Sequence, residues 1–179
     1  KLTDLAKELG KTTQFSAREA ADAMGFLAMA GFKTNEILGA LPGVLELASS
    51  ASLDLASAAD ITTNILTGYG RTVEQVGETN DILVKAFTSA NTDLVQLGQA
   101  FKFVGPVAKG AGLQFEEVTA MLAMMGNAGI QASMAGTGLR GAIVRLVNPT
   151  NKVNQALLQN GIITKDASGK LLPMTDIIA

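Results

Sequence analysis

Apolar side chains recur along most of the chain at the three- and four-residue spacing of amphipathic helices. Most of the resulting stripes follow a residue that can cap a helix, and Ser16 to Glu19 and Thr72 to Gln75 have the form of capping boxes. The stripes are Met24, Leu27 and Ala30; Ile37, Leu38 and Leu41; Leu55, Ala58, Ile61 and Ile65; Val73, Val76, Leu83, Val84 and Phe87; Leu94, Leu97, Phe101 and Val104; Val118, Met121, Leu122 and Met125. Pro42 should end or kink the second helix. The pattern predicts a mostly all-α protein, folded as a compact bundle of short helices.

The pattern changes near the C-terminus. Short apolar runs lie on either side of Asp166 to Gly169, a stretch with the composition of a turn. We therefore expect a small two-stranded β-hairpin over residues 162–172. A single hairpin is marginally stable, so it should rest on the helices.

Two segments of the chain resemble each other. Residues 31–37 read GFKTNEI and residues 112–118 read GLQFEEV, with a leucine at the same offset after each. This likeness indicates two related helical units, residues 12–70 and 92–147, joined by a helix over 73–90. A chance match is the alternative. In either case we expect one helical domain over residues 1–179. The chain lacks an initiator methionine and stops as a helix is starting, so we also expect it to be a fragment of a longer protein.

Residues 136–141, GTGLRG, match the glycine pattern that holds the pyrophosphate of a dinucleotide. Such a site needs a preceding strand and an acidic residue about 20 positions later. No strand pattern precedes these glycines, and the next acidic residue is Asp166, beyond Pro149. The apolar residues around them keep helical spacing, at Ala132, Ala135, Leu139, Ile143 and Leu146. The sequence therefore predicts a helix that binds no nucleotide, and the small opposite face should lie against another backbone. That face holds Met134, Gly138 and Gly141.

Composition narrows the possible chemistry. The chain has no His and no Cys, which removes His general bases, Cys nucleophiles, Cys- or His-based zinc sites and disulfides. Its net charge of −2 gives no electrostatic indication of nucleic-acid binding. Glu116 and Glu117 are adjacent, and neighbours on a helix point about 100° apart, so they suit a helix N-terminus better than a catalytic pair. We predict a non-enzymatic protein with no catalytic, cofactor-binding or metal-binding residues.

A membrane role needs separate consideration. Residues 118–139 carry no charge, and a bilayer is crossed by about 20 residues. The stretch nevertheless contains Asn127 and Gln131, and a helix break is expected at Gly126–Gly129. Two buried helices joined by a tight turn are the favoured interpretation.

Three stretches of the sequence, in this order, resemble one protein family. They are GFKTNEILGALPGVLELASSASLDLASAADITTNIL, GLQFEEVTAMLAMMGNAGIQASMAGTGLRGAIVRL and GIITKDASGKLLPMTDII. They are similar to the core region of phage tail tape measure proteins, a family of phage and prophage minor tail proteins. The resemblance runs from about Thr12 to the last residue, and the run at 129–140 together with the closing Gly-Lys segment is its most specific part.

The resemblance implies a structural role in a virion. Tape measure proteins are long, mostly helical chains that lie in several copies inside the tail tube, template its length and leave before or with the DNA. The resemblance implies as partners other copies of the chain, tail tube and tail-tip or baseplate proteins, tail assembly chaperones and the host membrane, after synthesis in the bacterial cytoplasm. It implies no catalytic residue and no cofactor here. Two alternatives stay open: a membrane-active helical domain that assists DNA across the host inner membrane, and a cytosolic helical adaptor unrelated to phages.

Overall fold

The computed structural model describes residues 1–178, which form ten α-helices and one short 3-10 helix, with no strand among them. The elements are α1 (Leu2–Thr12), α2 (Ala17–Met29), α3 (Thr34–Ala51), α4 (Leu55–Tyr69), η1 (Val73–Gln75), α5 (Val76–Ser89), α6 (Leu94–Ala111), α7 (Phe115–Asn127), α8 (Ala132–Val147), α9 (Asn151–Gln159) and α10 (Met174–Ile178). The all-α prediction is confirmed. Pro42 lies inside α3 and does not end it.

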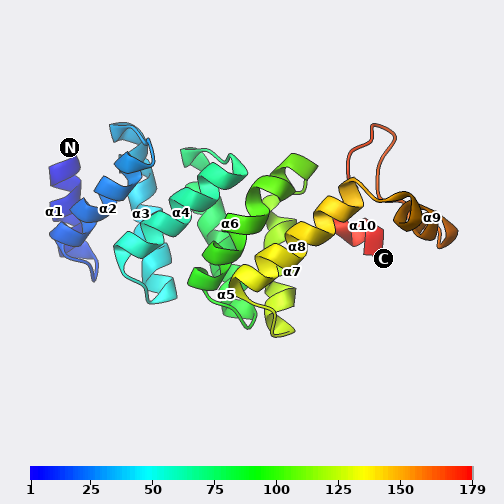
Figure 1. The fold of residues 1–179 in the computed structure, drawn as a ribbon. Coiled ribbons are helices and arrows are strands. Elements are labelled where there is room, and N and C mark those ends of the chain that lie inside the picture. The colour runs from blue at the N-terminus through cyan, green and yellow to red at the C-terminus, as the bar shows by residue number, and fades with distance from the viewer. Residues whose placement is uncertain (179) are drawn as a thin grey trace.

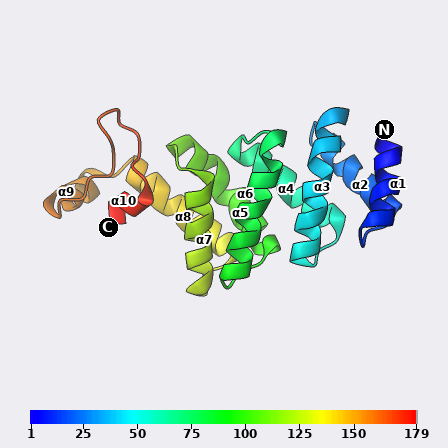
Figure 2. The ribbon, with the colours of Figure 1, turned by 180° about the vertical axis from the view of Figure 1, so that it is seen from behind.

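The helices form two layers. One layer contains α2, α4, α6 and α8 side by side (Figure 1), and the other contains α3, α5 and α7 (Figure 2). Successive helices cross from one layer to the other, so the array grows along one axis, from the N-terminus at one end to α9 and α10 at the other (Figure 1). The predicted bundle of short helices is present, but its helices are stacked in a row rather than gathered into a compact globule.

Six helices end with the same backbone motif, which explains the internal likeness in the sequence. In each, one residue adopts a left-handed conformation and the next N–H donates to the carbonyl five residues back, as Phe32 does to Leu27 and Leu113 does to Ala108, both at 3.1 Å. The left-handed residues are Gly31, Ser52, Gly70, Gly112, Gly129 and Gly161. Gly31 and Gly112 therefore share a helix-stop motif with four other sites. The predicted pseudo-duplication of 12–70 and 92–147 is not supported.

Ser52 is the exception among these helix ends, because it holds φ 53° without being glycine. A left-handed conformation costs a residue with a Cβ roughly 1–2 kcal/mol. We therefore expect Ser52→Gly to raise the free energy of unfolding by about 1 kcal/mol, and the reverse change Gly129→Ser, at an open site with φ 80°, to lower it by about as much. Urea denaturation of both variants checks this, and the same sign for both would contradict it.

The predicted β-hairpin over 162–172 is wrong, although the turn at its centre is present. Lys165 and Leu171 form an isolated antiparallel bridge with no strand on either side. The Asp166 carboxylate accepts hydrogen bonds from the Ser168 hydroxyl at 2.6 Å and from the Ser168 and Lys170 N–H groups at 2.9 and 3.0 Å. These bonds, that of the Ser168 side chain first, lower the pKa of Asp166. The Ser168 and Lys170 N–H groups thus bind the Asp166 side chain, whereas in a longer hairpin the Lys170 N–H would bind a backbone carbonyl of the opposite strand.

The buried side chains form two clusters that meet at α4. Leu55, Ala58 and Leu66 of this helix belong to a cluster with α1–α3, whereas Ile65 and Tyr69 belong to one with α5–α8 and the C-terminal segment. A single helical domain over 1–179 stays a prediction.

Candidate functional site

The glycine string at 136–141 lies inside α8, and no strand precedes it. Gly136 is buried against α6, where a Cβ would lie 2.8 Å from the Ala100 Cα and closer still to the Ala100 carbonyl oxygen. Gly138 is exposed, and a Cβ there would meet only the Met125 methyl group, at 3.5 Å. The predicted close approach to another backbone exists, but its assignment to the face of Met134, Gly138 and Gly141 is wrong. The contact is made on the apolar face of α8 instead. There Gly136 has no side chain, so the backbones of α6 and α8 can approach each other closely.

The uncharged stretch 118–139 is divided between two helices, as the sequence indicates. α7 ends at Asn127, Gly129 turns the chain with φ 80°, and α8 starts at Ala132. Within the described residues 1–178, no helix combines the length and the apolarity needed to cross a membrane.

Glu116 and Glu117 lie in the first turn of α7, the position expected from the helix dipole. Glu116 accepts a hydrogen bond from the Arg71 guanidinium at 3.1 Å, and Glu117 accepts one from the Met174 N–H. The two carboxylates therefore join α7 to different neighbours, and each is used in the packing of the fold.

Arg71 is the centre of a polar cluster that the sequence pattern did not predict. Its side chain is only 9% exposed and pairs with both Glu78 and Glu116. Its guanidinium lies over the Phe115 ring, 5.0 Å from the centroid. This cluster links the end of α4 to α5 and α7. The only available signal was that Arg71 follows a helix-ending glycine and is the one arginine between residues 19 and 139.

Tyr69 lies beside this cluster. Its hydroxyl donates to the Leu113 carbonyl at 2.8 Å, and its ring packs edge-on against Phe101 and Phe115. Burial, with a smaller contribution from Glu116 and Glu117, raises the pKa of the Tyr69 phenol well above its ordinary value. The group is held neutral as a structural donor.

Tyr69 gives a prediction for alkaline pH, because it is the single tyrosine of the chain. The native phenol holds its proton more tightly than the unfolded one, so the contribution of Tyr69 to the free energy of unfolding should be constant below about pH 10 and fall above it. Tyr69→Phe should remove that fall and lower stability by about 1 kcal/mol at neutral pH through loss of the buried hydrogen bond. Tyrosinate absorbance reports Tyr69 directly. Ionisation of the folded chain at pH about 10 would contradict this assignment.

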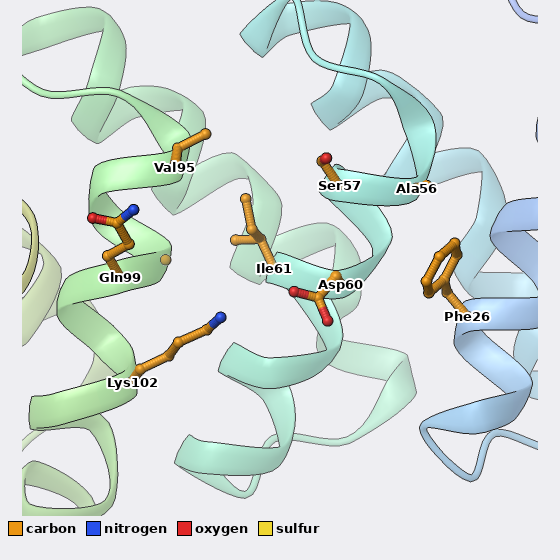
Figure 3. Close-up of a pocket in the computed structure, with 9 residues that line it drawn as sticks. Phe26, Ala56, Ser57, Asp60, Ile61, Val95, Gln99 and Lys102 are labelled. Carbon is orange, nitrogen blue, oxygen red and sulfur yellow. The ribbon is translucent and has the colours of Figure 1, made fainter.

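An open groove of about 320 Å³ is lined by residues of α2, α4 and α6. Figure 3 shows Phe26, Asp60 and Lys102 approaching it from α2, α4 and α6 in turn. The Ser57 hydroxyl on its wall already donates to the helix-capping Asp54 carboxylate at 2.7 Å and lowers the pKa of that group. Asp60 and Lys102 are both exposed, so water surrounds the two charged groups of the groove. No group of three or more His, Cys, Asp or Glu residues within 1–178 could hold a metal ion.

Comparison with known proteins decides the family. A family model described as "Phage-related minor tail protein" matches residues 3–179. The chain belongs to this family. The chain is 39% identical over 174 residues to the "Tape measure protein" of Pneumococcus phage Dp-1. It is 32% identical over 173 residues to the "Probable tape measure protein" of Escherichia phage P2. No solved structure matches it.

Each match covers 97% of this chain, and the chain spans 15% of the length of the Dp-1 protein and 21% of that of the P2 protein. The resemblance seen in the sequence is confirmed, and a cytosolic adaptor unrelated to phages has no support. Membership of this family identifies the chain as part of a phage tail component, and its two relatives are named as tape measure proteins.

Proposed function

We propose that this chain is a non-enzymatic structural domain of a tape measure protein that acts in the virion during tail assembly and DNA passage. The observation that carries the proposal is the 39% identity to a tape measure protein along 97% of the chain. Its partners are other copies of itself and the tail tube, tail-tip or baseplate proteins, with assembly chaperones before the tail closes and the host membrane at infection.

The two-layered array argues that this domain adds little to tail length. From α2 to α8 the layer advances by three interhelical steps, or roughly 30 Å at 8–10 Å per step. Residues 17–147 in one straight helix would extend roughly 200 Å. A domain folded back in this way is suited to assembly and contact, and the measuring length belongs to extended helix elsewhere in such a protein.

Deletion of residues 92–147 in the phage-encoded protein tests this role. The deletion removes α6, α7 and α8 and leaves the apolar faces of α4 and α5 without their partners, so we expect no infectious particles. An in-frame deletion of equal length from an extended helical part of the same protein should instead shorten the tail by about 1.5 Å per residue. Electron microscopy and plaque counts give both readouts. Infectious phage with tails shortened in that proportion by the 92–147 deletion would show that this domain is part of the ruler.

A further inference from the structure

The small net charge of −2 conceals a separation of charge between the α3–α5–α7 layer and the α6–α8 part of the other layer, whose helices α2 and α4 carry Arg18, Glu19, Asp22 and Asp60. α3, η1, α5 and α7 hold seven carboxylates, against Lys85 and the buried Arg71 that follows α4. α6 and α8 hold no acidic residue and carry Lys102, Lys109, Arg140 and Arg145. α6 and α8 pack side by side, and Lys102 and Arg140 are exposed on them.

The outer side of α6 and α8 forms what we call the basic face, made of Val95, Lys102, Phe103, Arg140 and Val144. Within each helix these residues recur at helical spacing, and all of them are exposed, Phe103 by 42% and Val144 by 49%. The ion pairs that the structure describes include neither cation of this face. Asp60 of α4 lines the same groove as Lys102 and offsets part of this charge, and the basic face combines the remaining positive charge with protruding apolar side chains.

The outer side of α5 and α7 forms the acidic face, made of Glu78, Asp81, Glu116 and Met124, of which Glu116 and Met124 line a groove. Glu78 and Glu116 remain 60% and 50% exposed beside Arg71, and Asp81 is exposed. Between the helices lies a mostly apolar groove of about 430 Å³. Its apolar lining includes Ile82, Ala86, Ala120, Ala123 and Met124, and the exposed Lys85 and Glu116 also line it. This face presents an apolar hollow with three exposed carboxylates against the single exposed cation Lys85, so its net charge is opposite to that of the basic face.

We propose that the basic face of one copy docks on the acidic face of a second copy, with Phe103 and Val144 entering the α5–α7 groove and Lys102 and Arg140 meeting its carboxylates. The two faces lie on opposite layers, so a bound pair keeps one free acidic face and one free basic face. Such a heterologous contact extends into a stack or closes into a ring. The contact rests on the proposed function in naming other copies of the chain as partners, but its test uses only this chain, so its failure would leave the tail role standing.

The size of the faces sets the expected strength. α6 and α8 have 18 and 16 residues and, as neighbours, offer an outer face of roughly 25 by 20 Å, or about 500 Å² per partner. A standard stable interface buries about 800 Å² per partner. The contact should therefore be weak in dilute solution and sensitive to salt, because the screening length falls from roughly 30 Å at 0.01 M to 3 Å at 1 M.

Sedimentation velocity of the 179-residue chain tests the proposal. At about 0.01 M ionic strength and rising concentration we expect the average mass to reach at least twice the 18.5 kDa of the monomer, and at about 1 M to return to it. Lys102→Glu with Arg140→Glu makes both faces acidic, and Asp81→Lys with Met124→Lys makes both basic, so each double variant should stay monomeric. Their mixture should associate, because every contact is then complementary again. Lys7→Glu with Arg18→Glu, on exposed positions of α1 and α2, is the matched control and should associate like the wild type.

Thermal melts of the variants establish that each is folded. A chain that is monomeric at every salt concentration, or an equimolar mixture of the double variants that does not associate, overturns the proposal. So does binding to phosphatidylglycerol vesicles through Lys102 and Arg140 by a chain that does not self-associate, because the basic face would then take a lipid surface as its partner.

Discussion

Gly136→Ala is expected to lower the free energy of unfolding by about 3 kcal/mol, although alanine favours a helix by about 1 kcal/mol over glycine. The new Cβ would lie 2.8 Å from the Ala100 Cα and 2.9 Å from its carbonyl carbon, both backbone atoms of α6. A flexible side chain could move away, but a backbone in the middle of α6 can only be displaced together with its helix. Separating α6 from α8 would loosen the cluster that contains Leu97, Phe101, Leu139 and Ile143.

Gly138→Ala is the matched control, two residues along the same helix. Gly138 is exposed and its new Cβ would make one ordinary contact, so the substitution should stabilise the chain by up to about 1 kcal/mol. Urea denaturation of the two variants gives changes of opposite sign. Equal changes would show that α6 and α8 do not approach as closely at Gly136 as described.

The helices could be predicted from the sequence because their determinants are local. The capping box at Ser16 is present, with the Glu19 N–H donating to the Ser16 hydroxyl at 3.2 Å and the Ser16 N–H donating to Glu19 at 2.7 Å. The stripe residues Leu27, Ile65 and Leu97 are all buried. The sequence analysis did not predict α9, although Thr150 caps its start and Val153, Ala156 and Leu157 form a short apolar stripe at helical spacing.

The contacts between helices could not be predicted in the same way. Helical spacing places Gly136 and Gly138 on different sides of α8, but only the position of α6 decides which side is covered. The Arg71 cluster likewise joins residues 71, 78, 115 and 116, which come together because α5 and α7 pack side by side. The layered array itself follows from these contacts, and a list of amphipathic helices is compatible with several arrangements.

Phe115 is expected to be among the most sensitive positions of the chain. Its ring is 2% exposed, stacks on Phe101 with centroids 5.0 Å apart and meets the edge of Tyr69 at 5.4 Å. The Arg71 guanidinium carbon lies over the same ring, 5.0 Å from its centroid. This one ring thus joins α4, α6 and α7.

Phe115→Ala should therefore lower the free energy of unfolding by about 4 kcal/mol, since truncation of a buried phenylalanine removes its transfer energy and leaves a cavity. Part of the loss is the aromatic and cation–π contact, worth about 1 kcal/mol for each pair. Phe103→Ala makes the same chemical change at a ring that is 42% exposed, and should cost less than about 1 kcal/mol. Hydrogen exchange adds a second readout: amides of α5–α8 should lose protection in Phe115→Ala, whereas those of α2 and α3, in the other cluster, should lose less. A Phe115→Ala chain as stable as Phe103→Ala would mean that the aromatic cluster does not hold these three helices together.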